Sequence, residues 1–330
     1  MMTAMKPLVV VTRNIPQAAL RLLRDHFRLD HHDRPTPLPR RDLLRRLRRA
    51  EGLLCLLSER VDAELFDAAP RLRMVATFSA GLDHIDLPEA ERRGILVSHT
   101  PGVLAETCAD YTWALLLAGA RRVVEGDRLV RAGRFRGWDP LLLLGADVHG
   151  KTLGLVGFGR IGQAVARRAA GFRMTVLYCS PHPAPRAVER RLGAVRVPLA
   201  ELLRRSDFVT LHAALSPETR YLIDARRLAL MKRTAFLING ARGPIVDERA
   251  LLRALRRKRL AGAALDVYET EPRLTPGLRG LPNVVLSPHL ASASLETRAA
   301  MGRLAADSLV EYLIFGRRPG NAVHARPHSS

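Results

Sequence analysis

The segment Leu153-Gly-Leu-Val-Gly-Phe-Gly-Arg-Ile-Gly162 decides the fold of this chain. Its first four residues predict a short buried strand, and residues 161–170 have helical spacing without a breaker. Between them lies G-x-G-x-x-G. Its first glycine permits a tight turn, its second lets a pyrophosphate approach the backbone, and its third lets the helix pack closely on the strand. The N–H groups at the start of such a helix attract phosphates. Because a second apolar strand is expected at residues 174–178, we predict a dinucleotide site here.

The length and composition of the chain indicate an ordinary globular protein with two domains. It has 330 residues, of which 47% are hydrophobic and 26% charged. No apolar run reaches the ~18 residues that a membrane helix needs, and residues 1–11 predict a first strand rather than a signal peptide. The three cysteines, Cys55, Cys108 and Cys179, are scattered and odd in number. We therefore expect no disulfide framework, no metal site and a reducing cytoplasm.

Basic residues outnumber acidic residues by 53 to 32, which gives a net charge of +21. Many are arginines on amphipathic segments such as 40–49 and 251–259. A positive field of this kind attracts polyanions without sequence preference. No recognised nucleic-acid motif accompanies it, so we interpret the arginines as a solvated surface and expect no nucleic-acid partner.

Predicted strands and helices alternate along the chain, which is typical of parallel sheets with helical crossovers. Residues 105–120 predict a long helix that continues to residue 133, residues 295–315 predict a second, and residues 317–330 a mobile tail. In the first part, strands are expected at 8–12, 52–57, 74–77 and 95–98, with helices at 16–27, 40–50 and 62–69. In the second part, strands are expected near 208–212, 235–239, 262–266 and 284–286.

The segment 135–144 is apolar and aromatic and precedes the dinucleotide motif. Such a segment is hard to bury within one subunit. We therefore expect a dimerisation arm near residues 121–147 and a homodimer.

Three side chains of different chemistry, Arg242, Glu271 and His289, follow predicted strands of the second part. In doubly wound folds the carboxyl ends of the strands bind ligands. An arginine there can polarise a carbonyl and hold a carboxylate, and a histidine can donate a proton to a developing alkoxide. A neighbouring carboxylate favours the protonated histidine near neutral pH. The alternatives are structural: a surface arginine, a turn carboxylate before proline and a buried histidine.

These three residues resemble the catalytic trio of the D-isomer-specific 2-hydroxyacid dehydrogenases, in Ala-Arg-Gly, Glu-Pro and Ser-Pro-His. The resemblance runs from about residue 9 to 318 and is strongest to the glyoxylate/hydroxypyruvate reductases. It includes segments 53–58, 79–84, 100–104, 134–138 and 157–162. It implies two doubly wound parallel-sheet domains, a Rossmann cofactor domain (101–289) inserted into a flavodoxin-like substrate domain (1–100 and 290–330). The implied activity is NAD(P)H-dependent reduction of small 2-keto acids, such as glyoxylate and hydroxypyruvate, to D-2-hydroxy acids.

The resemblance also implies residue roles. Arg242 would bind the substrate's carboxylate and keto oxygen, His289 would be the acid/base, and Glu271 would keep His289 protonated. The N–H groups of Ala80 and Gly81 would take the substrate carboxylate. Asp266 would bind the carboxamide of the nicotinamide, Leu57 would narrow the pocket, and Trp138 would reach into the partner subunit's site. The residues implied to contact the cofactor are Val103, Thr107, Gly157, Phe158, Gly159, Arg160, Ile161, Gly162, Ser180, Arg186, Ala214, Gly240, Ala241, Asp266 and Ala291.

Four of these positions depart from the residues that are usual in the family. Ala80 stands in place of valine, Ala214 in place of proline, Gly240 in place of a larger residue and Ala291 in place of glycine. None of these changes removes a group that performs chemistry.

Cofactor choice depends on the residue about 20 positions beyond the glycines, where NAD enzymes carry a carboxylate for the adenosine ribose. Here that residue is Ser180, and no Asp or Glu lies between Gly162 and Glu189. A serine can donate to a 2′-phosphate, and Arg186 or His182 can neutralise its charge. We therefore predict NADP(H) as the preferred cofactor, with NAD(H) as the alternative.

Two other functions share this scaffold. The C-terminal-binding corepressors are cofactor-sensing interaction proteins that carry the same trio, but this chain has no peptide-binding addition at its N-terminus. Formate dehydrogenases share the fold, but their site needs an Asn and a Gln. This chain instead has small residues around Ala80 and pairs Glu271 with His289. We therefore favour the 2-keto acid reductase.

Overall fold

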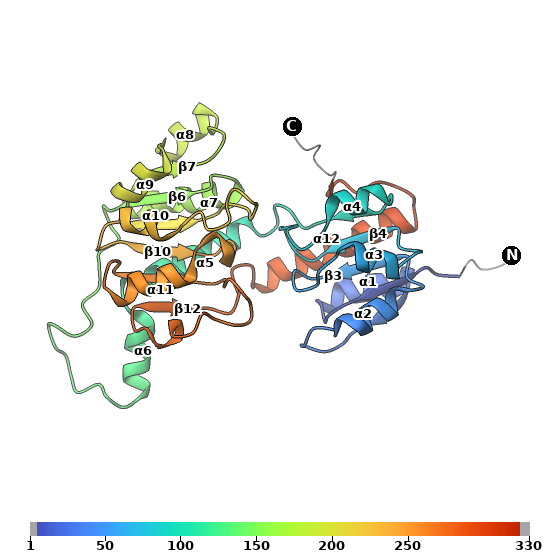
Figure 1. The fold of residues 1–330 in the computed structure, drawn as a ribbon, viewed down its shortest axis with the longest axis horizontal. Coiled ribbons are helices and arrows are strands. Elements are labelled where there is room, and N and C mark those ends of the chain that lie inside the picture. The colour runs from blue at the N-terminus through green and yellow to red at the C-terminus, as the bar shows by residue number, and fades with distance from the viewer. Residues whose placement is uncertain (1–4, 324–330) are drawn as a thin grey trace. The chain divides into compact units, whose positions relative to one another are not determined.

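The computed structural model describes residues 5–323 of the chain. The chain divides into two compact units, the first made of Met1–Leu104 with Ala293–Ser330 and the second of Ala105–Ser292. Each unit has its own sheet, covered by helices on both faces (Figure 1). The second unit is therefore an insertion in the first.

The sheet of the first unit has the strand order β13-β5-β4-β3-β1-β2. Strands β1 to β5 pair in parallel, and only β13 is antiparallel. Without β13 this order is that of flavodoxin-like folds, as predicted. The strands are β1 (Leu8–Val11), β2 (Arg28–His31), β3 (Gly52–Cys55), β4 (Met74–Thr77), β5 (Leu96–Ser98) and β13 (Ala322–Val323).

The helices of the first unit cover a sheet whose central strands are buried on both faces. β3 and β4 are buried along their whole length, as expected for central parallel strands. The long α12 packs against α1 and β4, and a Cβ on Gly52 would come within 2.8 Å of Leu313. These helices are α1 (Gln17–His26), α2 (Arg40–Leu47), α3 (Ala63–Ala68), α4 (Leu87–Arg92) and α12 (Leu295–Leu313).

The end of the chain corrects one prediction. We expected residues 317–330 to form a mobile tail, but Ala322 and Val323 pair with β5. Asn321 fixes this return: its side chain donates to the carbonyl of His99 (2.6 Å) and accepts from Ser308 Oγ (2.9 Å). Pairing between residues more than 200 positions apart leaves no local signal. Residues 324–330 lie outside the described part of the chain.

The sheet of the second unit has the order β12-β11-β10-β9-β6-β7-β8, with all pairs parallel. Chain order reverses between β6 and β9, which is the arrangement of a Rossmann fold, as predicted. The strands are β6 (Thr152–Val156), β7 (Thr175–Cys179), β8 (Ala194–Arg196), β9 (Phe208–Leu211), β10 (Phe236–Asn239), β11 (Gly262–Leu265) and β12 (Val284–Leu286). The helices are α5 (Ala105–Ala120), α6 (Val123–Arg131), α7 (Arg160–Ala169), α8 (Arg186–Leu192), α9 (Leu199–Arg205), α10 (Ala225–Leu230) and α11 (Glu248–Arg256).

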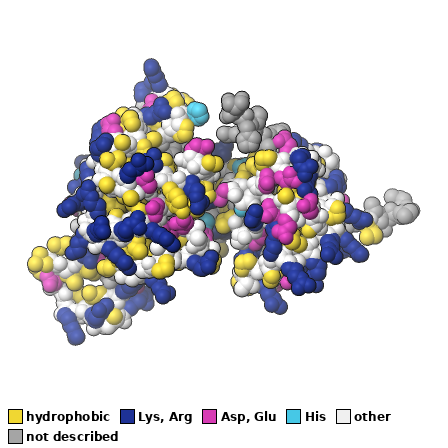
Figure 2. All heavy atoms as spheres, viewed as in Figure 1, with side chains coloured by type: hydrophobic (Ala, Val, Ile, Leu, Met, Phe, Trp, Pro, Cys, Tyr) yellow, Lys and Arg dark blue, Asp and Glu magenta, His cyan; other side chains and the backbone are white. Residues whose placement is uncertain are grey.

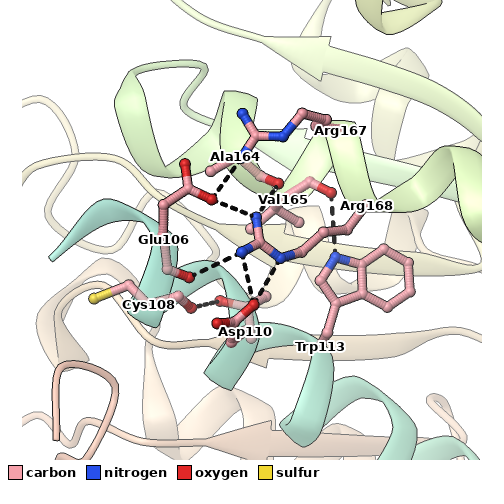
Figure 3. A network of polar contacts seen from close by, with 9 residues as sticks. Glu106, Cys108, Asp110, Trp113, Ala164, Val165, Arg167 and Arg168 are labelled. Carbon is pink, nitrogen blue, oxygen red and sulfur yellow. Dashed lines mark hydrogen bonds and ion pairs between the residues drawn. The ribbon is translucent and has the colours of Figure 1, made fainter. Parts of the chain in front are cut away.

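Helix α5 is held against α7 by an ion-pair network over a buried indole (Figure 3). Arg168 of α7 bonds Asp110 (2.8 Å) and the Glu106 carbonyl (3.3 Å) of α5. The Trp113 indole donates to the Val165 carbonyl (3.2 Å). Because α7 begins at the glycine motif, this packing also fixes the direction in which the start of α7 points.

The predicted continuation of the long helix to residue 133 is wrong. Helix α5 ends at Ala120, Arg122 is left-handed (φ 54°), and α6 starts a new direction (Figure 1). The Ala120 carbonyl, left without a helical partner, accepts from the N–H of Ala146 (2.8 Å) where the chain returns. The carbonyl at the end of the helix is therefore satisfied by a residue 26 positions further along the chain.

The segment between Arg122 and Ala146 exposes large apolar side chains. Trp138 is 85% and Leu141 75% exposed, and α6 buries none of its residues. In Figure 2 apolar and basic side chains mix over this lobe at the lower left. Large apolar side chains exposed close together are typical of binding surfaces.

Candidate active site

The three glycines of the motif have three different environments. Gly157 is left-handed (φ 95°), and a Cβ on it would lie 2.6 Å from the backbone of His212 on the neighbouring strand end. Gly159 begins α7 and has nothing within 4 Å of its Cβ position. A Cβ on Gly162 would lie 2.4 Å from the Gly157 carbonyl. The turn, the open approach and the close packing that the sequence requires are therefore all present.

The loop after β7, which carries Ser180, is tied at both ends. Arg196 of β8 donates to the carbonyls of Ser180 (3.0 Å) and Pro181 (2.9 Å). The Tyr178 hydroxyl accepts from the Ala184 N–H (2.9 Å) and donates to Glu189 (2.6 Å). Its ring stacks on Phe158 of the glycine turn, with centroids 4.0 Å apart. These hydrogen bonds and the ring stack hold the loop in a fixed position relative to the glycine turn.

Three adjacent strands of the second sheet end in one row. Asn239, Leu265 and Leu286 are register partners at the ends of β10, β11 and β12. The residues that follow each of them, up to Arg242, Glu271 and His289, therefore lie at one edge of the sheet. Arg242 lies in the loop after β10. Its guanidinium donates to the Ala241 carbonyl (2.9 Å), and its own carbonyl accepts from the Asn239 side chain (3.0 Å).

His289 and Glu271 form a direct pair. His289 Nδ1 lies 2.9 Å from Glu271 Oε2, and the other carboxylate oxygen accepts from the Tyr268 N–H (3.1 Å). The histidine is left-handed (φ 58°), a conformation that non-glycine residues rarely adopt and that clusters at functional sites. Because Nδ1 bonds Glu271, Nε2 is the ring nitrogen that can bond another group.

Burial raises the pKa of the Glu271 carboxyl, but its partners outweigh this effect. The hydrogen bond and charge of His289, the Tyr268 N–H and the charge of Arg242 all lower that pKa, so that it lies below its ordinary value. Glu271 is therefore an anion at neutral pH, and Arg242 lies near enough to act on it electrostatically.

Asp266 holds the histidine segment in place. This fully buried side chain accepts from the N–H groups of Leu290 and Ala291, each at 2.8 Å, while its own carbonyl accepts from the His289 N–H (2.9 Å). We expected a contact from Asp266 to the cofactor, and the structure adds this local task. Because Asp266 is 0% exposed and each of its oxygens already accepts a backbone N–H, the cofactor contact stays a prediction.

Sequence reasoning missed three residues that support this edge. The Tyr268 hydroxyl bonds both the carbonyl (2.8 Å) and the N–H (3.1 Å) of Ser287, and burial raises the pKa of this hydroxyl to about 12. Tyr111 of α5 bonds the Ser287 hydroxyl. Glu248 accepts from the Glu269 N–H (2.5 Å) and from Thr275 (2.8 Å). Their partners are distant in sequence, so only Tyr268, inside Asp-Val-Tyr-Glu-Thr-Glu, had a local signal.

In the first unit, Leu57 and Ala80–Gly81 follow β3 and β4. Leu57 is 39% exposed on a loop whose buried Glu59 accepts from Thr12 Oγ1 (2.8 Å) and the Leu56 N–H (2.6 Å). Among residues 5–323, the N–H groups of Ala80 and Gly81 donate to no protein acceptor.

The chain is similar in sequence to one known family of proteins. Residues 113–291 match the family model of the D-isomer specific 2-hydroxyacid dehydrogenase NAD binding domain. The chain is 49% identical over 312 residues to a glyoxylate reductase of Thermococcus kodakarensis, covering 93% of each chain.

Two solved structures extend the likeness to the fold. The TT0316 protein from Thermus thermophilus is 48% identical with a TM-score of 0.90, over 96% of this chain and 99% of that one. An NADPH-dependent glyoxylate/hydroxypyruvate reductase from Sinorhizobium meliloti, in complex with NADP and malonate, is 32% identical with a TM-score of 0.85, over 98% and 99%.

The chain belongs to the D-isomer specific 2-hydroxyacid dehydrogenases. The predicted family, the two-domain α/β fold and the Rossmann cofactor domain are thereby confirmed. The enzyme is an oxidoreductase whose second unit is a nicotinamide-cofactor domain.

The remaining predicted contacts of this dehydrogenase lie where the strands of the second unit end or where α5 begins. Gly240 and Ala241 follow β10, and nothing lies within 4 Å of a Cβ on Gly240. Ala214 follows β9, and its carbonyl accepts from Thr219 (2.7 Å). Thr107 lies in the first turn of α5, while Val103 belongs to the first unit and is 37% exposed.

Within residues 5–323, no group of three His, Cys, Asp or Glu side chains could hold a metal ion. None of the helices described is long and apolar enough to cross a membrane.

Proposed function

We propose that this dehydrogenase reduces glyoxylate and similar small 2-keto acids, hydroxypyruvate included, to D-2-hydroxy acids, with NADPH preferred over NADH. The observation that carries the proposal is the His289–Glu271 pair at 2.9 Å on the strand edge that also bears Arg242. The relatives named glyoxylate reductase and NADPH-dependent glyoxylate/hydroxypyruvate reductase support the substrate class.

Reduction of a keto acid needs one hydride on carbon and one proton on oxygen. When bound, the reduced nicotinamide supplies the hydride. The protein's task is to supply the proton and to stabilise the charge that develops on oxygen. His289 is held by Glu271 through Nδ1. It would donate a proton from Nε2 to that oxygen and become the neutral imidazole. Glu271, an anion at neutral pH, favours the protonated ring that must precede this step.

The anionic substrate needs cationic and N–H partners. Arg242 would hold both the carboxylate and the keto oxygen, which polarises the carbonyl. Ala80 and Gly81 offer two backbone N–H groups for which residues 5–323 provide no acceptor, which suits a carboxylate. Leu57 would limit the size of the substrate's third substituent.

The residues of the second unit fit a dinucleotide that carries a 2′-phosphate. The open space at Gly159 leaves room for the pyrophosphate at the start of α7. On the loop after β7, the nearest acidic residue in sequence, Glu189, already accepts from Tyr178. Arg196, which the sequence did not single out, adds a positive charge beside Ser180, and Arg186 begins α8. Arginines near Ser180, with no carboxylate between Gly162 and Glu189, favour NADPH.

Two further assignments belong to this proposal. The exposed apolar side chains between residues 121 and 147 would pack against a second copy, and Trp138 would lend its ring to the partner's site. The cysteines form no disulfide, and a reducing cytoplasm suits them.

The test is turnover by the purified protein with glyoxylate, hydroxypyruvate and bulkier 2-keto acids, each with NADPH and NADH. We expect glyoxylate or hydroxypyruvate to give the highest kcat/KM and NADPH to exceed NADH. Ser180→Asp should move the ratio of kcat/KM towards NADH, because the new carboxylate repels the 2′-phosphate. Ala187→Asp, at an exposed position in the first turn of α8, is a control for charge alone. Tight cofactor binding without turnover of any acid would instead favour a cofactor-sensing interaction protein. A tenfold advantage for NADH in the wild type would contradict the cofactor assignment.

A further inference from the structure

We propose that His99 is a positioning residue for the substrate carboxylate, because its ring fixes the peptide group that presents the Gly81 N–H. This rests on the proposed function, in which Ala80 and Gly81 bind that carboxylate. His99 follows β5, and Ala80 lies in the loop after the neighbouring β4.

Two successive peptide groups of the loop are held by the same neighbouring segment. The carbonyl of Ser79 accepts from the N–H of Thr100 at 2.8 Å. The carbonyl of Ala80 lies 2.9 Å from His99 Nδ1. Because a carbonyl only accepts, Nδ1 must carry the proton in this contact. Residues 99 and 100 therefore fix both carbonyls from one side.

The direction of the N–H groups follows from peptide geometry. Among the described residues only the Glu271–Pro272 peptide is cis, so both loop peptides are trans. In a planar trans peptide the carbonyl and the N–H of the next residue point in opposite directions. Holding the Ser79 carbonyl turns the Ala80 N–H away from residues 99 and 100, and holding the Ala80 carbonyl does the same for Gly81. The result is a pair of N–H groups on one side of the loop, fixed before an anion binds.

His99 is itself held by the returning end of the chain. Its carbonyl accepts from the side chain of Asn321 (2.6 Å), and its N–H donates to the Asn321 carbonyl (3.3 Å). Ser79 Oγ adds a bond to the Gly81 carbonyl (2.6 Å) from within the loop. His99 therefore connects Asn321, the residue before β13, through its backbone to the loop that would bind the carboxylate, which its ring contacts.

The test compares three variants by steady-state kinetics with glyoxylate and NADPH. His99→Phe keeps a flat ring but has no donor, so the Ala80 carbonyl loses its partner and the Gly81 N–H loses its fixed direction. We expect the KM for glyoxylate to rise about tenfold, with kcat changed by less than about threefold and the KM for NADPH unchanged. His99→Asn places an amide N–H near the position of Nδ1 and should restore most of the KM.

His32→Phe is the matched control. The His32 ring also bonds a backbone carbonyl, that of Thr36 (3.0 Å), but on an exposed loop elsewhere in the first unit. It should leave all three constants unchanged. Thermal unfolding of each variant shows whether the fold is retained.

Binding of oxamate, a non-reacting analogue of glyoxylate, separates this proposal from the proposed function. If the wild type binds oxamate but reduces no 2-keto acid, the proposed function fails, and weaker oxamate binding by His99→Phe still supports the positioning role. If the wild type reduces glyoxylate and His99→Phe has wild-type KM and oxamate affinity, the positioning role is overturned. Equal losses in His99→Phe and His99→Asn, or no oxamate binding by the wild type, overturn it too.

Discussion

His289 combines two features that rarely occur together by chance, a left-handed backbone and a direct bond to a carboxylate. The backbone conformation is stabilised by Asp266, which holds the N–H groups of the next two residues. Strain of this kind is usually maintained where a side chain has to point in one direction. The residue identities were predictable, but this conformation was not.

His289→Ala removes the proposed proton donor. We expect kcat for glyoxylate reduction to fall by about 10²–10⁴, because general acid catalysis contributes on that scale. Binding of NADPH, followed by fluorescence titration, should be nearly unchanged. A variant that retains near wild-type kcat would rule out His289 as the acid.

Glu271→Gln keeps a hydrogen-bonding side chain but removes the charge that favours the protonated ring. The alkaline limb of the pH profile for kcat/KM in the reduction direction should therefore move to lower pH. An unchanged alkaline limb would show that the carboxylate does not support the acid.

The lowered pKa of Glu271 also predicts how stability depends on pH. A carboxyl group whose pKa is lowered on folding stabilises the native state above its unfolded pKa, near 4.5, and this contribution disappears as the pH falls through the folded pKa. The wild type should thus exceed Glu271→Gln in the free energy of unfolding at pH 7 and lose that advantage below pH 4.5. Urea unfolding at both pH values measures this difference; a gap that widens on acidification would contradict the assignment.

At the scale of elements, the loops after β10 and β11 touch almost without a gap. A Cβ on Gly243 would lie 1.9 Å from the Tyr268 backbone, so only glycine permits this approach. These two loops carry Arg242 and Glu271. Their contact, together with the bonds of Tyr268 to Ser287, connects the ends of three strands into one rigid edge.

Gly243→Ala should force these two loops apart. We expect a loss of stability of roughly 2–4 kcal/mol, typical of overpacking with backbone displacement, and a fall of at least about tenfold in kcat/KM for glyoxylate. Gly280→Ala, where nothing lies within 4 Å of the new Cβ, is the control for the substitution itself. Chemical unfolding and steady-state kinetics check both; wild-type behaviour of Gly243→Ala would disprove the close contact.

At the scale of the whole molecule, the segment between α5 and β6 exposes several large apolar side chains close together in the chain. Leu141, Leu144 and Trp138 are all more than 60% exposed. The high positive charge is spread over the visible surface of both units (Figure 2) rather than gathered on this segment. The electrostatic repulsion between two copies at this segment is therefore weaker than the net charge of +21 suggests.

Replacement of Trp138 by Ala tests the proposed dimer and the shared site together. We expect the wild type to sediment as a dimer at micromolar concentration. Trp138→Ala should change KM or substrate preference by severalfold while the unfolding temperature stays within a few degrees, because the ring is solvent-exposed in a single chain. Phe135→Ala, in the same segment, is a comparison for general weakening of the interface. A monomeric wild type would contradict the arm assignment.

Local patterns in the sequence determined the fold class and predicted the residues of the candidate site. The glycine motif between strand and helix, the alternation of strands and helices, and the residues Arg242, Glu271 and His289 all lie within segments of a few residues. Hydrophobic periodicity and turn chemistry operate over such distances. For the same reason, the family and its two-domain architecture were predictable.

Tertiary structure alone decided the features that depend on residues far apart in the chain. The return of the chain to Ala120 ends α5 early, and Asn321 turns an apparent tail into β13. Tyr111, Glu248, Arg196 and His99 support loops that lie 16 to 176 residues away in the chain. A hydrogen bond between distant segments depends on how sheets bring strand ends together, and no periodicity in either segment encodes it.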